Sequence, residues 1–215
     1  MEKEATVPPM ILDGPAAGPA VVPIIALAHG AGAPMDSPFM NTMAAGLAAA
    51  GLAVARFEFP YMRRRRETGE GRPPDREPAL RQAWLEVIAA LGGGERLVIG
   101  GKSMGGRMAS LVADEAGVRG LVCLGYPFHP PGQPGKLRTA HLRDLRTPTL
   151  IVQGTRDALG SREDVEGYDL SPAIRIVWLE DGDHSFKPRV ASGHTEKEHL
   201  ATAVAAVEHF VRELG

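Results

Sequence analysis

The fold is decided by residues 97–105, which read Leu97-Val98-Ile99-Gly100-Gly101-Lys102-Ser103-Met104-Gly105. The first four residues form the short apolar run of a buried strand, and the last five form a G-x-S-x-G motif directly after it. A helical pattern follows over residues 104–112. Glycines on both sides of Ser103 allow a tight, strained turn between strand and helix. The stretch therefore predicts that Ser103 lies exposed at a helix N-terminus, where a developing negative charge is favoured.

Short apolar runs alternate with helical patterns along most of the chain. We expect six strands, at residues 24–28, 52–57, 97–100, 121–124, 149–152 and 174–179. Runs that are apolar on both faces are typical of interior strands of a parallel sheet. The pattern predicts an α/β fold with a mainly parallel central sheet of about six to seven strands and helices on both faces. No linker divides the chain, so we expect one domain over residues 1–215, with an irregular segment at 1–20.

Helix start and stop signals lie between the predicted strands. Ser37 followed by Pro38 predicts a helix start, and an apolar stripe from Leu80 ends at three consecutive glycines. Thr195 and Glu198 have the spacing of a capping box at the start of the last helix. The predicted core face of that helix consists of Leu200, Val204, Val207, Val211 and Leu214.

The composition excludes several classes of protein. A chain of 215 residues, 44% hydrophobic and 23% charged, can bury a core without disulfides or metals. The single cysteine, Cys123, lies in an apolar run and is expected in that core. A net charge of −2 gives no reason to expect nucleic-acid binding. Because we find neither an apolar leader nor a run of about 18 apolar residues, we expect no membrane contact and a cytoplasmic location.

Two segments depart from the alternation of strands and helices. Residues 60–74 contain four consecutive arginines, Arg63 to Arg66, and are expected to form a solvated loop, with recognition of anionic groups as the alternative. Residues 126–148 join two predicted strands. About two dozen residues are too few for a substantial lid, so we expect an open site.

A serine nucleophile needs a base and an acid that orients the base. Asp157 follows the strand predicted at 149–152, and His184 follows the strand predicted at 174–179. The order serine, aspartate, histidine is the order that accompanies a G-x-S-x-G elbow. Asp183, adjacent to His184, is expected to stabilise the loop. A phosphate-binding loop is excluded, because the position that such a loop requires to be glycine is Arg96.

The remaining histidines carry weaker signals. His194, His199 and His209 do not have the spacing of a zinc-binding pair on a helix, so we expect them at the surface and expect no metal site. No motif implies an organic cofactor. His129 lies after a strand that neighbours the serine and is a candidate for substrate contact.

These motifs together resemble an α/β-hydrolase over residues 20–214, in particular the small cap-less "predicted hydrolase" branch that is similar to dienelactone hydrolases. A fourth motif, His29-Gly30-Ala31-Gly32, stands where such enzymes have their oxyanion loop. The resemblance implies that the backbone N–H groups of Ala31 and Met104 bind the oxyanion. Dienelactone hydrolases have a cysteine where this chain has Ser103, so their substrate is not carried over. The branch also resembles testis-expressed and NSL-complex hydrolase-like proteins.

Several side chains are expected near the substrate, because they follow or approach strand ends where pockets form in α/β sheets. These candidates are His29, Phe39, Tyr61, Phe128 and His129.

The sequence favours a serine hydrolase that cleaves carboxylic esters or thioesters through Ser103, His184 and Asp157 and an acyl-enzyme intermediate. A small-molecule substrate is expected, and an acyl group carried on a protein stays open as the alternative. Two alternatives stay open. One is a non-catalytic interaction module that retains the hydrolase fold, and the other is an acyltransferase or lyase that uses the same three residues. The oligomeric state has no sequence signal.

Overall fold

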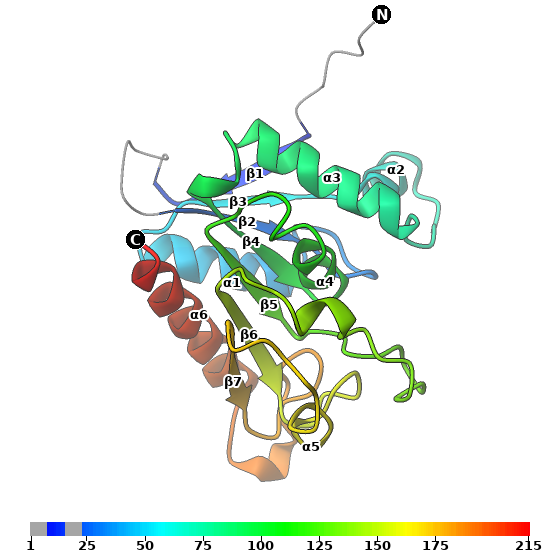
Figure 1. The fold of residues 1–215 in the computed structure, drawn as a ribbon, viewed down its shortest axis with the longest axis vertical. Helices are drawn as coiled ribbons and strands as arrows, with labels where there is room; N and C mark the ends of the chain where they lie inside the picture. Colours follow the sequence, from blue (N-terminus) through cyan, green and yellow to red (C-terminus); the bar gives the residue numbers. More distant parts are fainter. Residues whose placement is uncertain (1–7, 16–22) are drawn as a thin grey trace, which may run out of the picture.

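The computed structural model describes residues 8–15 and 23–215, whose strands form one seven-stranded sheet (Figure 1). The strand order is β1-β3-β2-β4-β5-β6-β7. Their bounds are β1 Met10–Asp13, β2 Ile24–Ala28, β3 Val54–Phe57, β4 Leu97–Lys102, β5 Gly120–Leu124, β6 Thr149–Gly154 and β7 Ile174–Leu179. All neighbours pair in parallel except β1 and β3. The predicted mainly parallel α/β sheet and all six predicted strands are confirmed.

The N-terminal segment departs from the prediction, because Met10–Asp13 forms a strand where an irregular chain was expected. It pairs antiparallel to β3, with Asp13 opposite Val54. The Arg56 guanidinium donates hydrogen bonds of 2.8 and 3.0 Å to the Asp13 carboxylate. A four-residue edge strand is too short to show alternation in the sequence. Residues 8–9 and 14–15 lie outside any strand or helix, as expected, and residues 1–7 and 16–20 lie outside the described residues.

Helices cover both faces of the sheet (Figure 1). One face carries α1 (Pro38–Ala49) and α6 (Glu196–Glu213); the other carries α2 (Pro60–Thr68), α3 (Glu77–Ala90) and α4 (Met104–Ser110). The strands supply alternate side chains to two cores: Ile25 and Leu27 pack with the α1 and α6 side, and Ala26 and Ala28 with the other. The shorter helices are η1 Gly94–Arg96, η2 Ala140–Leu142, α5 Arg162–Val165 and η3 Val190–Ser192.

The predicted helix starts are confirmed. Ser37 is the N-cap of α1, with Pro38 in its first turn. Thr195 and Glu198 form both hydrogen bonds of a capping box at the start of α6. The core face of α6 is partly different from the predicted one, because His199, expected at the surface, is buried and its Nδ1 lies 2.8 Å from the Phe186 carbonyl oxygen.

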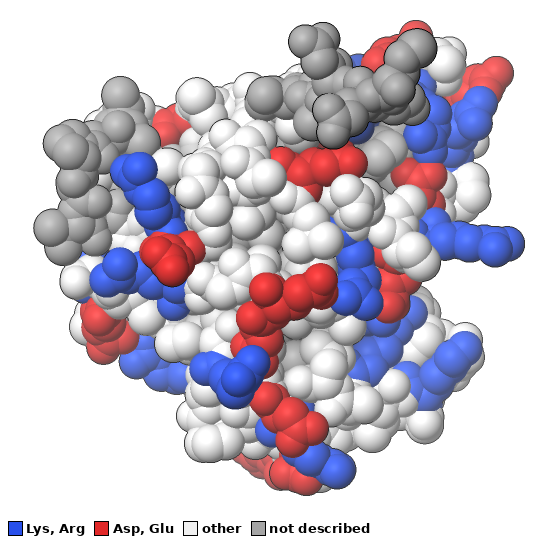
Figure 2. Space-filling model, turned by 45° about the horizontal axis from the view of Figure 1, so that its top comes forward, with Lys and Arg blue, Asp and Glu red and all other residues white. Residues whose placement is uncertain are grey.

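The arginine run lies in a helix, which corrects the expected loop over residues 60–74. Arg64 pairs with Asp75, and Arg66 contacts Glu58 at 2.6 Å and Asp36 at 2.8 Å. The Glu58 side chain is only 2% exposed, so Arg66 neutralises a buried carboxylate. On the face in Figure 2, basic and acidic side chains lie interspersed. Two of the four arginines therefore have structural partners, which a run of like charges does not reveal.

The segment between β5 and β6 builds no lid. Residues 125–148 are irregular apart from the three-residue η2. Cys123 is buried in the core, as predicted. Within residues 8–15 and 23–215, no helix is both long and apolar enough to cross a membrane.

Candidate active site

Ser103 lies at a sharp turn between β4 and α4. Its backbone has φ 51° and ψ −114°, a conformation that costs a non-glycine residue energy. The glycines around it permit this turn: a Cβ on Gly101 would lie 2.0 Å from the Ala28 carbonyl oxygen, and one on Gly105 would lie 2.5 Å from the same atom. The G-x-S-x-G spacing is thus a consequence of how closely the turn approaches β2.

A chain of hydrogen bonds begins at the Ser103 hydroxyl. Its Oγ lies 2.9 Å from His184 Nε2, and His184 Nδ1 lies 2.7 Å from Asp157 Oδ2. The Asp157 side chain is fully buried and also accepts hydrogen bonds from the Gln153 amide (2.9 Å) and the Leu159 N–H (2.8 Å). Because an ionised carboxylate only accepts, Nδ1 carries the imidazole proton and Nε2 is free to accept from Ser103. The structure therefore brings together the three residues that the sequence selected.

The loop that carries His184 is fixed from two sides. The Asp183 carboxylate accepts the N–H groups of Ser185 (2.8 Å) and Lys187 (2.9 Å). The Lys102 ammonium donates a 2.5 Å hydrogen bond to the His184 carbonyl oxygen. Asp183 stabilises the loop as expected, whereas the contact of Lys102 was missed because the variable position of the motif is usually exposed. Burial lowers the pKa of Lys102 to about 8.

Two residues that flank the site, Met104 and Ala31, come from neighbouring elements. Met104 begins α4, and Ala31 lies in the turn after β2. Within the part of the chain that the structure describes, neither N–H has a hydrogen-bond acceptor. The Tyr61 hydroxyl donates a 2.8 Å hydrogen bond to the Ala31 carbonyl oxygen, which fixes the orientation of that peptide. Both N–H groups therefore have donor capacity that is not used within the described residues.

The buried side chain of His29 also stabilises the turn that carries Ala31. It is fully buried; its Nδ1 lies 2.7 Å from the Gly30 carbonyl oxygen, and its Nε2 accepts the Phe59 N–H at 3.2 Å. Burial lowers the pKa of His29, which keeps the ring neutral and suited to one donated and one accepted hydrogen bond.

An open pocket of about 550 Å³ lies over Ser103 and His184. Phe39 lines it, as expected from the sequence. The lining residues that sequence reasoning did not select for it include Met40, Ser185 and Glu196. Of these, Glu196 had one available signal, because it is the first residue of the helix that follows the histidine loop.

Four of the five expected substrate contacts do not line this pocket, which corrects the prediction. These are His29, Tyr61, Phe128 and His129, all of them buried. Phe128 packs against Tyr126 and Tyr168, and His129 Nδ1 lies 3.0 Å from the Pro130 carbonyl oxygen. Position after a strand end brought them near the site, but their side chains turn into the core.

A second serine–histidine contact lies in the same molecule. Ser110 Oγ, at the end of α4, lies 2.8 Å from His141 Nε2, and also donates to the Arg107 carbonyl oxygen at 2.7 Å. Burial lowers the pKa of His141 to about 4. Ser110 is buried, and no carboxylate in the described residues bonds His141.

The sequence matches a family model described as "Alpha/beta hydrolase domain" over residues 22–212. The chain belongs to the α/β-hydrolase family. Among solved structures, this hydrolase is similar to a lidless α/β serine hydrolase from Xanthomonas campestris, with a TM-score of 0.67 and 21% identity over 95% of this chain and 88% of that one. Est1E from Butyrivibrio proteoclasticus gives a TM-score of 0.69 at 18% identity, over 95% and 93% of the chains. A dienelactone hydrolase from Anabaena variabilis gives 0.66 at 21% identity, over 95% and 90%.

These similarities support the cap-less, dienelactone-hydrolase-like fold expected from the sequence. The resemblance to testis-expressed and NSL-complex proteins stays a prediction.

Proposed function

We propose that the protein is a serine hydrolase that cleaves carboxylic ester or thioester bonds in small molecules. The observation that carries this proposal is the continuous hydrogen-bonded chain from Ser103 through His184 to the buried Asp157, with Ser103 and His184 open to a pocket. A non-catalytic module has no physical need for a strained serine that lines a pocket and is paired in this way.

The reaction begins with attack of Ser103 Oγ on the acyl carbon while His184 Nε2 takes the hydroxyl proton. Asp157 stabilises the imidazolium that forms. The carbonyl oxygen becomes an oxyanion and accepts the N–H groups of Ala31 and Met104. The bond to the leaving oxygen or sulfur then breaks, and His184 returns its proton to the leaving group. Water attacks the acyl-enzyme by the same steps and releases Ser103.

The pocket supports a small substrate. Its volume of about 550 Å³ is within the range for small-molecule sites, and no lid covers it. Partial positive charge at the start of α4 adds to the stabilisation of the oxyanion beside Ser103. Asp157, buried and held by Gln153, keeps the imidazole in one tautomer throughout.

A fluorophosphonate probe tests the proposal, because it reacts with activated serines. Intact-protein mass is measured for the native chain, Ser103→Ala, His184→Ala and the control Ser185→Ala, whose exposed serine has no histidine partner. We expect one adduct on the native chain and the control, and none on the first two variants. A folded native chain without an adduct, or an adduct that persists in Ser103→Ala, would reject the proposal.

A further inference from the structure

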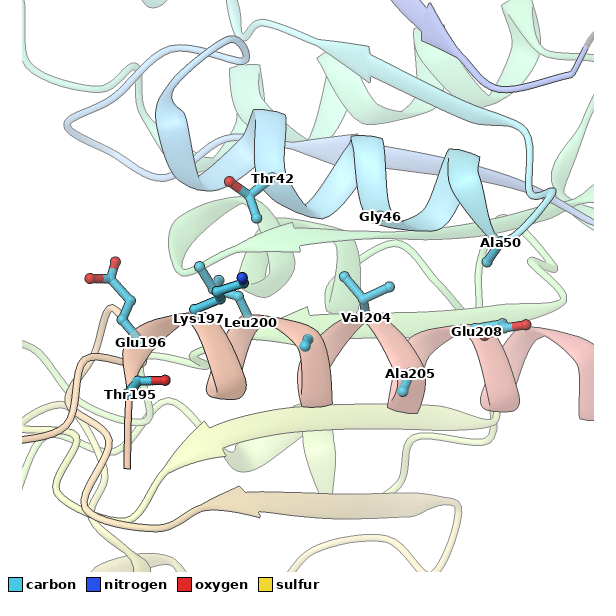
Figure 3. A pocket seen from close by; sticks show the side chains of 11 residues that line it. Thr42, Gly46, Ala50, Thr195, Glu196, Lys197, Leu200, Val204, Ala205 and Glu208 are labelled. Carbon is cyan, nitrogen blue, oxygen red and sulfur yellow. The ribbon is translucent and has the colours of Figure 1, made fainter. Parts of the chain in front are cut away.

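An apolar groove of about 940 Å³ runs between α1 and α6 (Figure 3). Thr42, Gly46 and Ala50 line it from α1, and the stretch of α6 from Glu196 to Glu208 lines it from the other side. The helices are in close contact at Gly46, where a Cβ would lie 2.7 Å from a Val204 methyl carbon. The small residues on both sides leave a channel along the seam.

Some apolar side chains of α6 are not fully covered by the core. Leu200 and Val204 belong to the apolar stripe of the helix, yet both stay half-buried at the groove. The positions that pack into the core are Ala203, Val207, Phe210 and Val211. Apolar side chains left beside a channel offer a surface that another apolar group can cover.

The groove begins beside the pocket over Ser103. Glu196 lines both cavities. On α1, Phe39 lines the pocket, and Thr42, about one turn further along, lines the groove. Both helices thus begin at the proposed active site and carry the channel away from it. A chain attached to a substrate in the pocket can pass Glu196 into the groove.

The side on which the groove opens identifies which part of an ester enters it. His184 gives its proton to the leaving group, which must lie beside that imidazole. Ser185, next in the chain, and Glu196 line the pocket together with His184, and Glu196 borders the groove. The N–H groups proposed to hold the oxyanion belong to other elements, the turn after β2 and the start of α4.

We propose that the α1–α6 groove binds an unbranched, uncharged aliphatic chain in the leaving group of the substrate, an alkyl alcohol or thiol. The inference rests on the proposed function. Glu196, Lys197 and Glu208 give the groove charges of both signs, so neither an anionic nor a cationic chain is favoured along its length. On α1 the groove extends from Thr42 to Ala50, about 12 Å at ~1.5 Å per residue, so it suits a chain of medium to long length.

The first experiment measures kcat/KM for alkyl acetates from ethyl to dodecyl, below their aggregation concentrations. Full burial of a methylene corresponds to about a fourfold gain in affinity, so an open groove is expected to give about twofold per methylene and about 10²-fold from butyl to dodecyl. We expect Ala201→Trp and Ala205→Trp, which fill the groove, to reduce the dodecyl-to-butyl ratio to below about fivefold. The control Thr202→Trp, an exposed position of α6 outside the groove, retains the full ratio.

A matched series of ethyl alkanoates, from butanoate to dodecanoate, lengthens the acyl chain instead. We expect both groove variants to leave its length dependence unchanged. An effect of the variants on the acyl series alone, or on neither series, overturns the inference. Sedimentation at the assay concentration tests whether a second copy of the chain occupies the groove instead. A native dimer that becomes monomeric in Ala201→Trp would show that the groove is an interface between copies, and this result would also overturn the inference.

A binding measurement separates this inference from the proposed function. Calorimetry with 1-decanol on the Ser103→Ala protein needs no turnover. We expect binding that weakens at least tenfold when Ala201→Trp is added and is unchanged when Thr202→Trp is added. A native protein that hydrolyses no ester, with decanol binding retained, would reject the proposed reaction and keep the groove as a binding site. A native protein that hydrolyses esters, with no decanol binding that depends on the groove, would keep the reaction and reject the groove as a binding site.

Discussion

Two serine–histidine contacts of nearly equal length lie in this molecule. They differ in the backbone conformation of the serine, in its burial and in the partners of the histidine. Ser103 and His184 are 2.9 Å apart, and Ser110 and His141 are 2.8 Å apart. Ser103 has positive φ and opens to a pocket, whereas Ser110 is buried at the end of a helix. Asp157 bonds the first histidine; the second meets only hydroxyl groups among the described residues.

The comparison shows that the surroundings of a histidine decide whether it can act as a base. A histidine that is to accept a proton needs a partner that stabilises its charged form, and a buried Asp157 supplies this for His184. Burial near Arg107 instead lowers the pKa of His141 to about 4, so its imidazolium is disfavoured. The same contact is therefore suited to proton transfer in one place and to packing in the other.

Removal of each serine hydroxyl is the strongest way to test this difference. Ser103→Ala is expected to lower kcat for ester hydrolysis by about 10⁶-fold, because the proposed triad acts as a unit. Ser110→Ala is expected to change kcat less than threefold. Steady-state kinetics on a p-nitrophenyl ester measures both, and circular dichroism confirms folding. Comparable losses in the two variants would remove the distinction between the contacts.

The proposed nucleophile and the fold were readable from sequence because they depend on local rules. The strained turn at Ser103 requires glycines at fixed positions, and buried parallel strands require apolar runs. The strand at Met10–Asp13 gave no signal, because its partner lies some forty residues away and it is too short to alternate. The helix that carries the arginine run was missed for a similar reason: its partners Glu58, Asp36 and Asp75 are set by tertiary contacts.

Orientation of side chains near the site was the part that sequence could not supply. The order of strands placed His29 and Phe128 near the proposed site, but whether a side chain points to the pocket or the core depends on the turn that carries it. Glu196 is the opposite case, a residue that was not expected at the pocket but lines it, because the packing of α6 against α1 places it there. Backbone hydrogen bonds and packing, not residue type, decide these positions.

The acid is the second feature that separates the two contacts. Asp157→Asn keeps the shape of the site but favours the wrong tautomer of His184, so kcat is expected to fall by about 10⁴-fold. Asp183→Asn, beside the histidine and bonded only to loop N–H groups, is expected to cost less than tenfold. Kinetics of the two variants at pH 8 checks this. Equal losses would mean that the loop carboxylate orients the imidazole.

The proposed oxyanion donors provide a third, smaller test, because Ala31 lines the pocket over Ser103 and its N–H has no acceptor among the described residues. Ala31→Pro removes one donor and is expected to lower kcat about 10²- to 10³-fold with KM little changed. Gly32→Ala is the control: its Cβ would meet no atom within 4 Å, and its φ is not positive. Full activity in folded Ala31→Pro protein would assign the donor to another residue.

The smallest expected effect concerns the histidine of the buried contact and appears in stability rather than in rate. The pKa of His141 is about 4 in the folded chain and about 6.5 when unfolded, so between these values the unfolded chain binds a proton that the native chain does not. The free energy of unfolding therefore falls as pH drops from 6.5 to 4, by about 1–3 kcal/mol from this group. Other groups also contribute to the dependence of stability on pH, so the measurement is the difference between native protein and His141→Gln in urea unfolding at pH 7, 5.5 and 4. We expect that difference to shrink towards low pH; a constant difference would show that His141 is protonated as readily in the fold as outside it.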